Sequence, residues 1–333
     1  MRAPRHWSRP PDSPGWQART LAPLGWLYAR ETARRTGGAR PRAPVPVICI
    51  GNLSAGGTGK TPAAIALAQH LSDTGHRVQF LSRGHGGRLA GPAQVDPARH
   101  TSADVGDEPL LLSAFGPAWV ARDRLEGARA AARAGAEVVL MDDGFQSATL
   151  APDLSILIVD AATGFGNGRV IPAGPLREPV AAGLARADAV LSVGAPEAQA
   201  GFDAAWPAAG ALPRLRGRIA PLQTGMDWSD LRVVAFAGIG RPEKFFATLR
   251  DMGARIAAAH ALGDHEPIAP ALFQRLLQEA RQAHAQLVTT EKDAVRLSPQ
   301  ERREVLVLPV RMTVADWAPL APLLTGMLAD RRG

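Results

Sequence analysis

The stretch Ser54-Ala55-Gly56-Gly57-Thr58-Gly59-Lys60-Thr61 decides the predicted fold. It follows a short apolar run, residues 45–50, that predicts a buried strand. Residues 62–71 after it predict a helix. Pro62 does not argue against it, because a proline is tolerated in the first turn. Glycines let backbone amides surround phosphate oxygens, and the helix N-terminus adds its positive end. Strand, glycine-rich turn and helix together predict a phosphate-binding loop formed by residues 54–61.

Two side chains of this loop have a chemical role in the prediction. Lys60 can reach the β and γ phosphates of a nucleotide, and the Thr61 hydroxyl can ligate Mg²⁺. The strict loop pattern has Gly at position 54, where this chain has Ser. The alternative is a glycine-rich turn without a ligand. Gly-Lys-Thr after three glycines, between a predicted strand and a predicted helix, favours a nucleotide site.

Apolar runs and helical stretches alternate along the rest of the chain. Further strands are predicted at residues 78–82, 137–141, 154–159, 189–193, 232–237, 286–289 and 305–310. The alternation predicts an α/β fold, with a P-loop NTPase-like, doubly wound and mainly parallel sheet and a second, smaller α/β domain. We expect a P-loop domain at residues 44–225, in which 195–225 form a connection, and a C-terminal domain at 226–333.

A phosphate-binding loop needs an acid that organises the metal ion. Asp142 and Asp143 end a predicted strand, as a Walker B carboxylate does, and are the predicted Mg²⁺ ligands together with Thr61. Asp160 also ends a predicted strand and is the competing candidate. The double acid and the order of the strands favour Asp142.

Charge is concentrated at the N-terminus. Residues 1–43 hold nine Arg and two acids, a net charge of +7, so the remaining residues sum to zero. A nucleic-acid binder would need positive charge spread over the body, so this class is disfavoured. The segment also contains Trp7, Trp16, Trp26 and Tyr28, and residues 16–35 predict an amphipathic helix. Arg with Trp and Tyr is typical of a membrane-interface segment; the alternative is an Arg-rich leader from a biased genome.

Other features narrow the class of protein. The lone Cys49 provides no disulfide framework, and no apolar run reaches the ~18 residues of a membrane-spanning helix. Residues 238–240, Gly-Ile-Gly, lack the third glycine of a dinucleotide fingerprint. Residues 291–293, Glu-Lys-Asp, lack the spacing of a guanine-reading motif.

Motifs across residues 44–296 resemble those of the tetraacyldisaccharide 4'-kinase family. The similar stretches are 51–62 around the phosphate loop, Ser82-Arg83-Gly84, Gly106-Asp107-Glu108-Pro109, 142–146 (Asp-Asp-Gly-Phe-Gln), 172–178 (Pro-Ala-Gly-Pro-Leu-Arg-Glu), 235–240, Asp264-His265 and 290–293 (Thr-Glu-Lys-Asp). Ser or Thr at position 54 is usual in that family. One departure is His85, where the family usually has Tyr.

The resemblance implies a lipid kinase of lipid A biosynthesis. Its cofactors would be ATP and Mg²⁺, its acceptor the 4'-hydroxyl of tetraacyldisaccharide 1-phosphate, and its location the cytoplasmic face of the anionic inner membrane, as a peripheral protein. It implies no protein partner. The phosphate loop alone is compatible with two other classes of protein. A GTPase-type metallochaperone would need a guanine-reading motif and metal ligands, and a small-metabolite kinase would not need the aromatic leader.

The resemblance also implies roles for particular residues. Asp107 is the predicted general base, although an acid before a proline-started helix is also typical of an N-cap. His265 is predicted to orient or tune Asp107. Arg177 adds positive charge to the phosphates; an ordinary surface pair with Glu178 is the alternative. Arg83 and Glu178 are predicted to contact the substrate.

Overall fold

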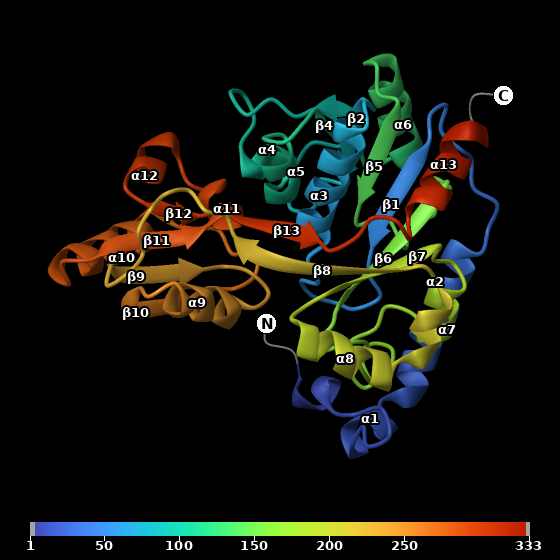
Figure 1. Cartoon of the computed structure of the whole chain (residues 1–333), viewed down its shortest axis with the longest axis horizontal. Helices are drawn as coiled ribbons and strands as arrows, with labels where there is room; N and C mark the ends of the chain where they lie inside the picture. Colours follow the sequence, from blue (N-terminus) through green and yellow to red (C-terminus); the bar gives the residue numbers. More distant parts are fainter. Residues whose placement is uncertain (1–3, 331–333) are drawn as a thin grey trace.

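The computed structural model describes residues 4–330, which form two β-sheets (Figure 1). The larger sheet has nine strands in the spatial order β13-β8-β7-β6-β1-β5-β2-β4-β3 within these residues. Neighbouring strands from β8 to β4 run parallel, and the edge strands β13 and β3 run antiparallel. The bounds are β1 Val47–Gly51, β2 Val78–Ser82, β3 Ala93–Gln94, β4 Ala118–Val120, β5 Val138–Asp142, β6 Leu154–Asp160, β7 Ala189–Val193, β8 Arg214–Pro221 and β13 Val310–Val314.

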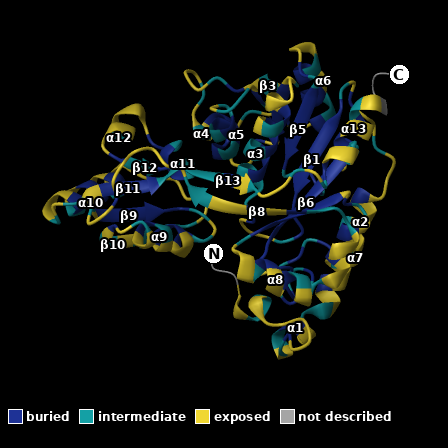
Figure 2. Cartoon of the chain, in the orientation of Figure 1, coloured by how far each residue is buried: buried dark blue, intermediate teal, exposed yellow. Residues whose placement is uncertain are grey.

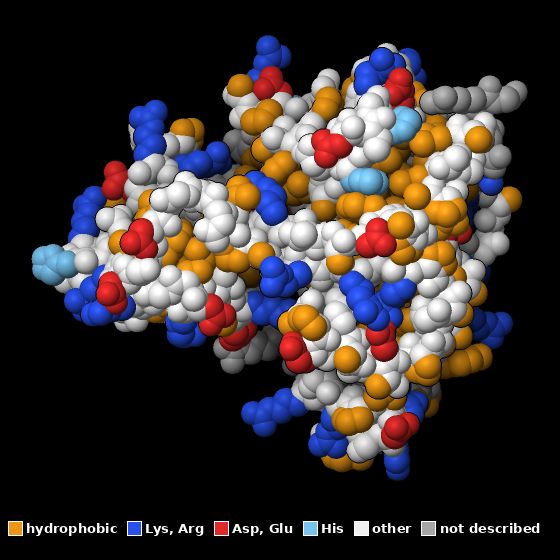
Figure 3. Space-filling model, in the orientation of Figure 1, with side chains coloured by type: hydrophobic (Ala, Val, Ile, Leu, Met, Phe, Trp, Pro, Cys, Tyr) orange, Lys and Arg blue, Asp and Glu red, His pale blue; other side chains and the backbone are white. Residues whose placement is uncertain are grey.

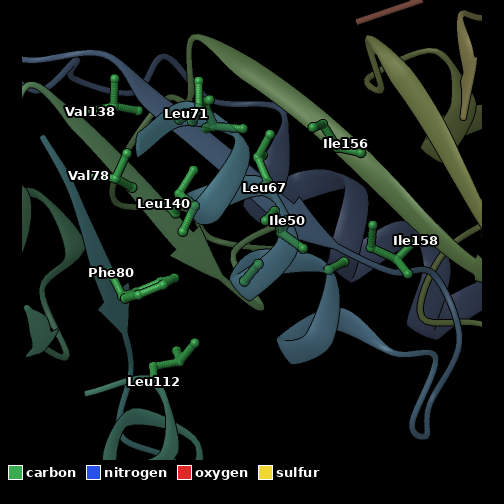
Figure 4. Packing of buried hydrophobic residues seen from close by; sticks show 14 of the residues in the cluster. Ile50, Leu67, Leu71, Val78, Phe80, Leu112, Val138, Leu140, Ile156 and Ile158 are labelled. Atoms are coloured by element: carbon green, nitrogen blue, oxygen red, sulfur yellow. The ribbon is translucent and has the colours of Figure 1, made fainter. Parts of the chain in front are cut away.

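Both faces of this sheet are buried, because successive side chains of a strand point to opposite faces. Ile48 and Ile50 of β1 pack in one core with α3, while Val47 and Cys49 pack in a second core with α6 and α8. Figure 4 shows the first core, where Leu67 of α3 lies over the strands. The helices around the sheet are α1 Trp16–Thr20, α2 Ala22–Thr36, α3 Lys60–Asp73, α4 Ser102–Val105, α5 Asp107–Leu112, α6 Arg124–Arg133, α7 Val180–Leu184, α8 Pro196–Ala205 and α13 Ala321–Asp330, with short 3₁₀ helices at Arg5–Ser8 and Pro207–Ala211.

The smaller sheet is parallel and has the order β10-β9-β11-β12. Its helices cover both faces: Phe245 and Leu249 of α9 pack on one side, and Phe273 and Leu276 of α10 pack on the other. In Figure 2 the inner strands of both sheets are buried, while the edge strand β10, much of β8 and the outer sides of the helices are exposed. The bounds are β9 Arg232–Ala237, β10 Arg255–Ala261, β11 Gln286–Thr290, β12 Leu306–Leu308, α9 Pro242–Asp251, α10 Pro270–Gln282, α11 Glu291–Ala294 and α12 Pro299–Arg303.

The observed sheets differ from the expected segments at two places. Residues 195–225, expected as a connection, contain β8, which extends the larger sheet. The strand expected at 305–310 is two strands: β12 joins the smaller sheet, while β13 pairs with β8 of the larger one. Residues 310–330 therefore pack with the P-loop sheet, and not with the smaller sheet as the expected 226–333 domain requires. Figure 1 shows β8 and β13 extending from the larger sheet toward the smaller one.

The N-terminal segment folds onto the larger sheet's second core. The expected helix at 16–35 is observed as α1 and α2, separated at Leu21. Trp7 donates its indole N–H to the Pro172 carbonyl, and Asn167 donates to the His6 carbonyl. Residues 1–3, including Arg2, and 331–333 belong to the predicted terminal segments but lie outside the described residues. No helix within residues 4–330 combines the length and apolar character needed to cross a bilayer.

Surface charge on the face in Figure 3 is mixed. Lys and Arg side chains alternate there with Asp and Glu over both sheets, while basic and hydrophobic side chains lie together around α1. This distribution agrees with the balanced charge of the body and the basic N-terminus.

The sheet core gives a stability prediction. Leu140 of β5 is fully buried in the core beneath α3. Leu140→Ala should lower the free energy of unfolding by about 2–5 kcal/mol, because it removes buried methyl groups and leaves a cavity. The control Leu222→Ala changes a side chain that is 42% exposed and should cost little. Urea unfolding followed by circular dichroism measures both, and equal losses would contradict the described packing.

Candidate active site

The phosphate loop is held in shape by Asn52, a fully buried side chain just after β1. Its amide nitrogen lies 2.8 Å from the Ser54 carbonyl, 3.2 Å from the Gly56 carbonyl and 3.1 Å from the Thr58 hydroxyl. Gly59 then adopts a φ of +91°, which is unfavourable for other residues, and α3 starts at the next residue. The loop thus wraps around one amide group and delivers Lys60 and the helix N-terminus to its centre.

The metal-binding residues predicted from sequence meet at the end of β5. The Thr61 hydroxyl donates to Oδ2 of Asp142 at 3.3 Å, and Oδ1 of Asp142 is buried with no hydrogen-bond partner among the described residues. Burial and the negative charges of Glu108 and Asp143 raise the pKa of Asp142 above its usual range, although Lys60 opposes them. A buried carboxylate oxygen without a partner, beside a hydroxyl, is a donor set that fits a hard cation such as Mg²⁺.

Two positively charged side chains of the site lie beside the Asp143 carboxylate. Lys60 Nζ lies 3.6 Å and Arg177 Nη1 3.3 Å from its Oδ1. Burial alone would raise the pKa of Asp143, but the positive charges of Lys60 and Arg177 outweigh it and lower that pKa. Asp143 has a φ of 51°, a left-handed conformation that turns the chain away from β5. Two cations therefore stand beside the phosphate loop.

Arg177 reaches this position through backbone pairing. Its N–H donates to the Leu53 carbonyl at 2.7 Å, and the Ala55 N–H donates to the Pro175 carbonyl at 2.7 Å. Leu176 between them is fully buried. The segment 175–177 therefore lies against the start of the phosphate loop as a fixed neighbour.

Glu178, a predicted substrate-contacting residue, is buried in an ion pair. Its side chain is 3% exposed, and both carboxylate oxygens accept from Arg186 at 2.6 and 2.7 Å. It also accepts from Gln146, which donates to the Asn52 carbonyl and accepts from Arg177. Because its oxygens face inward, Glu178 supports the phosphate loop and Arg177 from behind.

Asp160, the competing Walker B candidate, has another role. Its Oδ2 accepts from Lys244 at 2.6 Å and from Arg241 at 3.0 Å, both from the start of α9. This carboxylate therefore links the larger sheet to the smaller one and lies outside the cluster of Thr61 and Asp142.

Asp107 and His265 are brought together from the two sheets. His265 Nδ1 lies 3.0 Å from Oδ2 and 3.1 Å from Oδ1 of Asp107. Asp107 is the first residue of α5, its side chain is 5% exposed, and Gly106 occupies the N-cap position. The expected meeting of Asp107 with His265 is confirmed, and the N-cap alternative for Asp107 is wrong.

Two more positively charged side chains, from the smaller sheet's side, lie near Asp107. Arg296 donates its Nε to Oδ2 at 3.2 Å, and Lys292 lies on the far side of His265, 3.0 Å from Nε2. Burial alone would raise the pKa of Asp107, but the His265 hydrogen bond and the charges of Lys292 and Arg296 lower it to about 2. The hydrogen bond to Asp107 raises the pKa of His265. Asp107 is therefore an ionised carboxylate at neutral pH.

The glycines of 238–240 serve close packing. A Cβ at Gly240 would lie 3.2 Å from the Gly57 amide nitrogen of the phosphate loop. A Cβ at Gly238 would lie 2.9 Å from an Asp293 carboxylate oxygen, which accepts the Gly238 N–H. The loop after β9 therefore lies directly against the phosphate loop, and the smaller sheet forms one wall of the site.

Arg83 and His85 follow β2 at the same edge of the larger sheet. Arg83 is exposed, and its charge lowers the pKa of the neighbouring buried Arg124, after the larger effect of burial. The His85 ring lies 6.1 Å from the His265 ring, edge to face. The histidine that departs from the family pattern therefore stands beside the Asp107–His265 pair.

The geometry combines a phosphate cradle, a carboxylate pair for a cation and an ionised carboxylate backed by histidine. These are the parts that phosphoryl transfer to a hydroxyl requires. A family model described as Tetraacyldisaccharide-1-P 4'-kinase matches residues 17–329. The chain belongs to the tetraacyldisaccharide 4'-kinase family. It is accordingly an ATP-dependent kinase of lipid A biosynthesis, and its P-loop kinase-like α/β fold agrees with the prediction.

Individual relatives support the assignment to this kinase family. The tetraacyldisaccharide 4'-kinase of Dinoroseobacter shibae is 62% identical over 97% of each chain, and that of Jannaschia sp. is 58% identical over 96% of this chain and 97% of its own. A crystal structure of the apo form of LpxK from Aquifex aeolicus in complex with ATP has a TM-score of 0.72 at 25% identity. It covers 93% of this chain and 99% of that one.

Sequence reasoning about this kinase missed several contacting residues. Asn52 and Gln146 lie inside the quoted motifs but received no role, because buried amides that hold a loop have no signature of their own. Arg296 follows the 290–293 motif by three residues, at helical spacing from Asp293. That spacing was a signal that could have pointed to it.

Asn52 provides a test of the loop's construction. Asn52→Ala removes the amide that donates to three loop acceptors and should weaken ATP binding by roughly 5- to 30-fold, about 1–2 kcal/mol. Titration calorimetry with Mg-ATP measures the change. The control Gln69→Ala alters an exposed amide on α3 and should leave the affinity unchanged. An unaltered Kd in folded Asn52→Ala protein would show that the loop holds its shape without this amide.

Proposed function

We propose that the chain transfers the γ-phosphate of ATP to the 4'-hydroxyl of tetraacyldisaccharide 1-phosphate, with Mg²⁺ as cofactor. The observation that carries the proposal is the Asp107–His265 contact beside a phosphate loop whose Gly57 is approached by Gly240. A hydroxyl that enters between them would meet a carboxylate on one side and the nucleotide's last phosphate on the other. Family membership supplies the identity of the acceptor.

Nucleotide binding is assigned to residues 54–61. Their backbone amides, with the N-terminus of α3, would hold the phosphate oxygens, and Lys60 would neutralise the γ-phosphate. Arg177, beside Asp143, adds a second positive charge where the transition state spreads its charge over the phosphoryl oxygens.

The residues for Mg²⁺ are Thr61, Asp142 and Asp143. The unpartnered Oδ1 of Asp142 and the Thr61 hydroxyl fit direct or water-mediated ligation, with phosphate oxygens completing the shell. The metal ion would supply charge neutralisation between the β and γ phosphates.

Asp107 is assigned the role of accepting the proton of the acceptor hydroxyl. As the 4'-oxygen bonds to the γ-phosphorus, the bond from phosphorus to the bridging oxygen of ADP breaks and the hydroxyl proton moves to Asp107. A carboxylate with a low pKa is a weak base, but a loose phosphoryl-transfer transition state needs orientation of the hydroxyl more than early deprotonation. His265 and Arg296 hold the carboxylate in place for this step.

Arg83 is proposed to meet the acceptor's 1-phosphate. It is exposed at the end of β2, on the edge of the sheet that carries the site. We propose that Glu178 holds Gln146 and Arg186 in place, because its buried carboxylate accepts hydrogen bonds from both. We also propose that residues 310–330 belong to the P-loop domain, because β13 extends its sheet.

The N-terminal segment is proposed to rest on the anionic inner membrane at its cytoplasmic face. Its exposed apolar side chains include Trp16 at 70%, Leu24 at 54%, Trp26 at 60% and Leu27 at 56% exposure. Arg30 of the same helix lies over the Trp26 ring, 5.6 Å from its centroid. An acceptor with four acyl chains lies in a membrane, so an aromatic and basic surface is suited to reach it.

The deciding experiment is ATP-dependent phosphorylation of tetraacyldisaccharide 1-phosphate in detergent at saturating Mg-ATP. Wild-type protein should form the 4'-phosphorylated product, and Asp107→Ala should lower kcat by on the order of 10²-fold or more, because the hydroxyl loses its proton acceptor. The control Asp73→Ala removes an exposed carboxylate at the end of α3 and should retain activity. Absence of product from wild type would overturn the proposed acceptor, and full activity of Asp107→Ala would remove it as the base.

Membrane association has a separate test. Trp26→Ser with Leu27→Ser should reduce co-sedimentation with vesicles that contain anionic phospholipid, because two exposed apolar side chains are lost. Substitution is preferable to truncation, since residues 6 and 7 make hydrogen bonds with residues 167 and 172 of the body. The matched control is Ile219→Ser with Leu222→Ser, exposed apolar residues of the β8 region. Equal binding of both variants would argue against α2 as the contact.

A further inference from the structure

His265 is flanked on both ring nitrogens. Nδ1 faces Asp107, and Nε2 lies 3.0 Å from Nζ of Lys292. Lys292 belongs to the short helix α11, whose first turn is capped by the Thr290 side chain. Lys292 lies within the 290–293 motif, but the proposed function gives it no role. Its contact with the imidazole of His265 indicates one.

The chemistry of the two groups fixes where the ring proton lies. A lysine ammonium has three donors and no acceptor, so a charged Lys292 matches only an unprotonated Nε2. The ring proton then lies on Nδ1, which donates to Asp107. A doubly protonated ring would instead place an N–H donor of a cation 3.0 Å from the ammonium. Oδ1 of Asp264 lies beside both groups, but at 3.7 Å from Nε2 it is too far to accept a hydrogen bond from the ring. Lys292 therefore favours the neutral Nδ1–H tautomer.

The groups around the ring pull in opposite directions. The hydrogen bond to Asp107 prevails and raises the pKa of His265, while burial and the charge of Lys292 oppose it and limit the rise. Asp264 lies 3.7 Å from Nε2 and adds a weaker raising effect. The groups that face the ring or its partners are Asp107 and Glu108 from α5, His85 after β2, Asp264, Lys292 and Arg296.

The ammonium is itself held in place. Lys292 Nζ lies 3.5 Å from Asp264 and 3.7 Å from Glu108, and the side chain is 22% exposed. These two carboxylates hold the Lys292 ammonium beside Nε2 of His265. The contact with Glu108 also joins α11 to α5 across the two sheets, so a purely structural clamp is the competing interpretation.

We propose that Lys292 is a positioning residue that locks His265 in its neutral Nδ1–H tautomer and thereby keeps Asp107 an oriented, ionised acceptor for the substrate hydroxyl. The catalytic consequence rests on the proposed function, whereas the tautomer itself is a property of the protein alone. Protonation of His265 to imidazolium would draw the Asp107 carboxylate into a charged pair and make it a poorer proton acceptor. Activity should therefore fall as the pH drops through the His265 pKa.

The sign of the effect follows from these contacts. Lys292→Met keeps the length of the side chain and removes the charge that opposes imidazolium formation, so the His265 pKa should rise. The acidic limb of the kcat–pH profile should then move to higher pH, with kcat about tenfold lower near neutrality and recovering as the pH increases. The KM for ATP should change little, because Lys292 does not contact the phosphate loop. Lys292→Arg, which keeps a donor and a charge, should restore part of the loss.

Lys244→Met is the matched control. Lys244 also bridges the two sheets, through Asp160 at 2.6 Å, but does not contact His265. Loss of a general clamp should lower kcat equally at every pH, so Lys244→Met should leave the acidic limb where it is. If Lys292→Met lowers kcat by one factor at all pH values, or leaves the whole profile unchanged, the proposal is overturned.

A measurement on the full-length protein without substrate separates this proposal from the proposed function. Histidine side-chain ¹⁵N NMR, with His265 assigned by its loss in His265→Gln, reports both tautomer and pKa. The expected result is a protonated Nδ1 and an unprotonated Nε2 in wild type, and a higher His265 pKa in Lys292→Met. A wild-type ring protonated on Nε2 alone would refute the proposal, whatever acceptor the enzyme phosphorylates.

Discussion

The contact between Asp107 and His265 joins two residues that lie 158 positions apart, one in α5 beside the larger sheet and the other in the loop after β10 of the smaller sheet. Asp107 follows Gly106, whose positive φ turns the chain into α5, and His265 itself has a φ of 59°. The smaller sheet holds His265 in reach because Gly238 and Gly240 let the loop after β9 approach Asp293 and the phosphate loop. This approach makes the two halves of the site face each other. The nucleotide half is the phosphate loop with Asp142 and Asp143, and the base half is Asp107 with His265.

Local sequence patterns predicted the strand, turn and helix around residues 54–61, because these elements are consecutive in the sequence. Strand, glycine-rich turn and helix at residues 47–73 are built from contacts within one segment, and Asp142 and Asp143 end a strand next to it. The base half depends on tertiary contacts, so Asp107 and His265 could be paired in advance only through a family resemblance. The same reason explains why Lys292 and Arg296 had no predicted role.

Edge strands and buried ion pairs were the weak points of prediction. Arginines alternate with apolar residues and glycine along β8, so it lacks the apolar run that predicts the inner strands. β13 pairs with β8 although all four strands of the smaller sheet lie between them in the sequence, which no local pattern indicates. Glu178 is buried against Arg186, a tertiary contact that the motif alone does not indicate.

The central claim is that Asp107 and His265 act as one unit that the two sheets assemble. A double-mutant cycle on kcat with Asp107→Asn and His265→Gln, using the tetraacyldisaccharide 1-phosphate acceptor, tests it most directly. If the two side chains act together, the double variant should be about as slow as the slower single variant, because the second change removes nothing further. Losses that multiply in the double variant would show that the two residues act independently and would contradict this account.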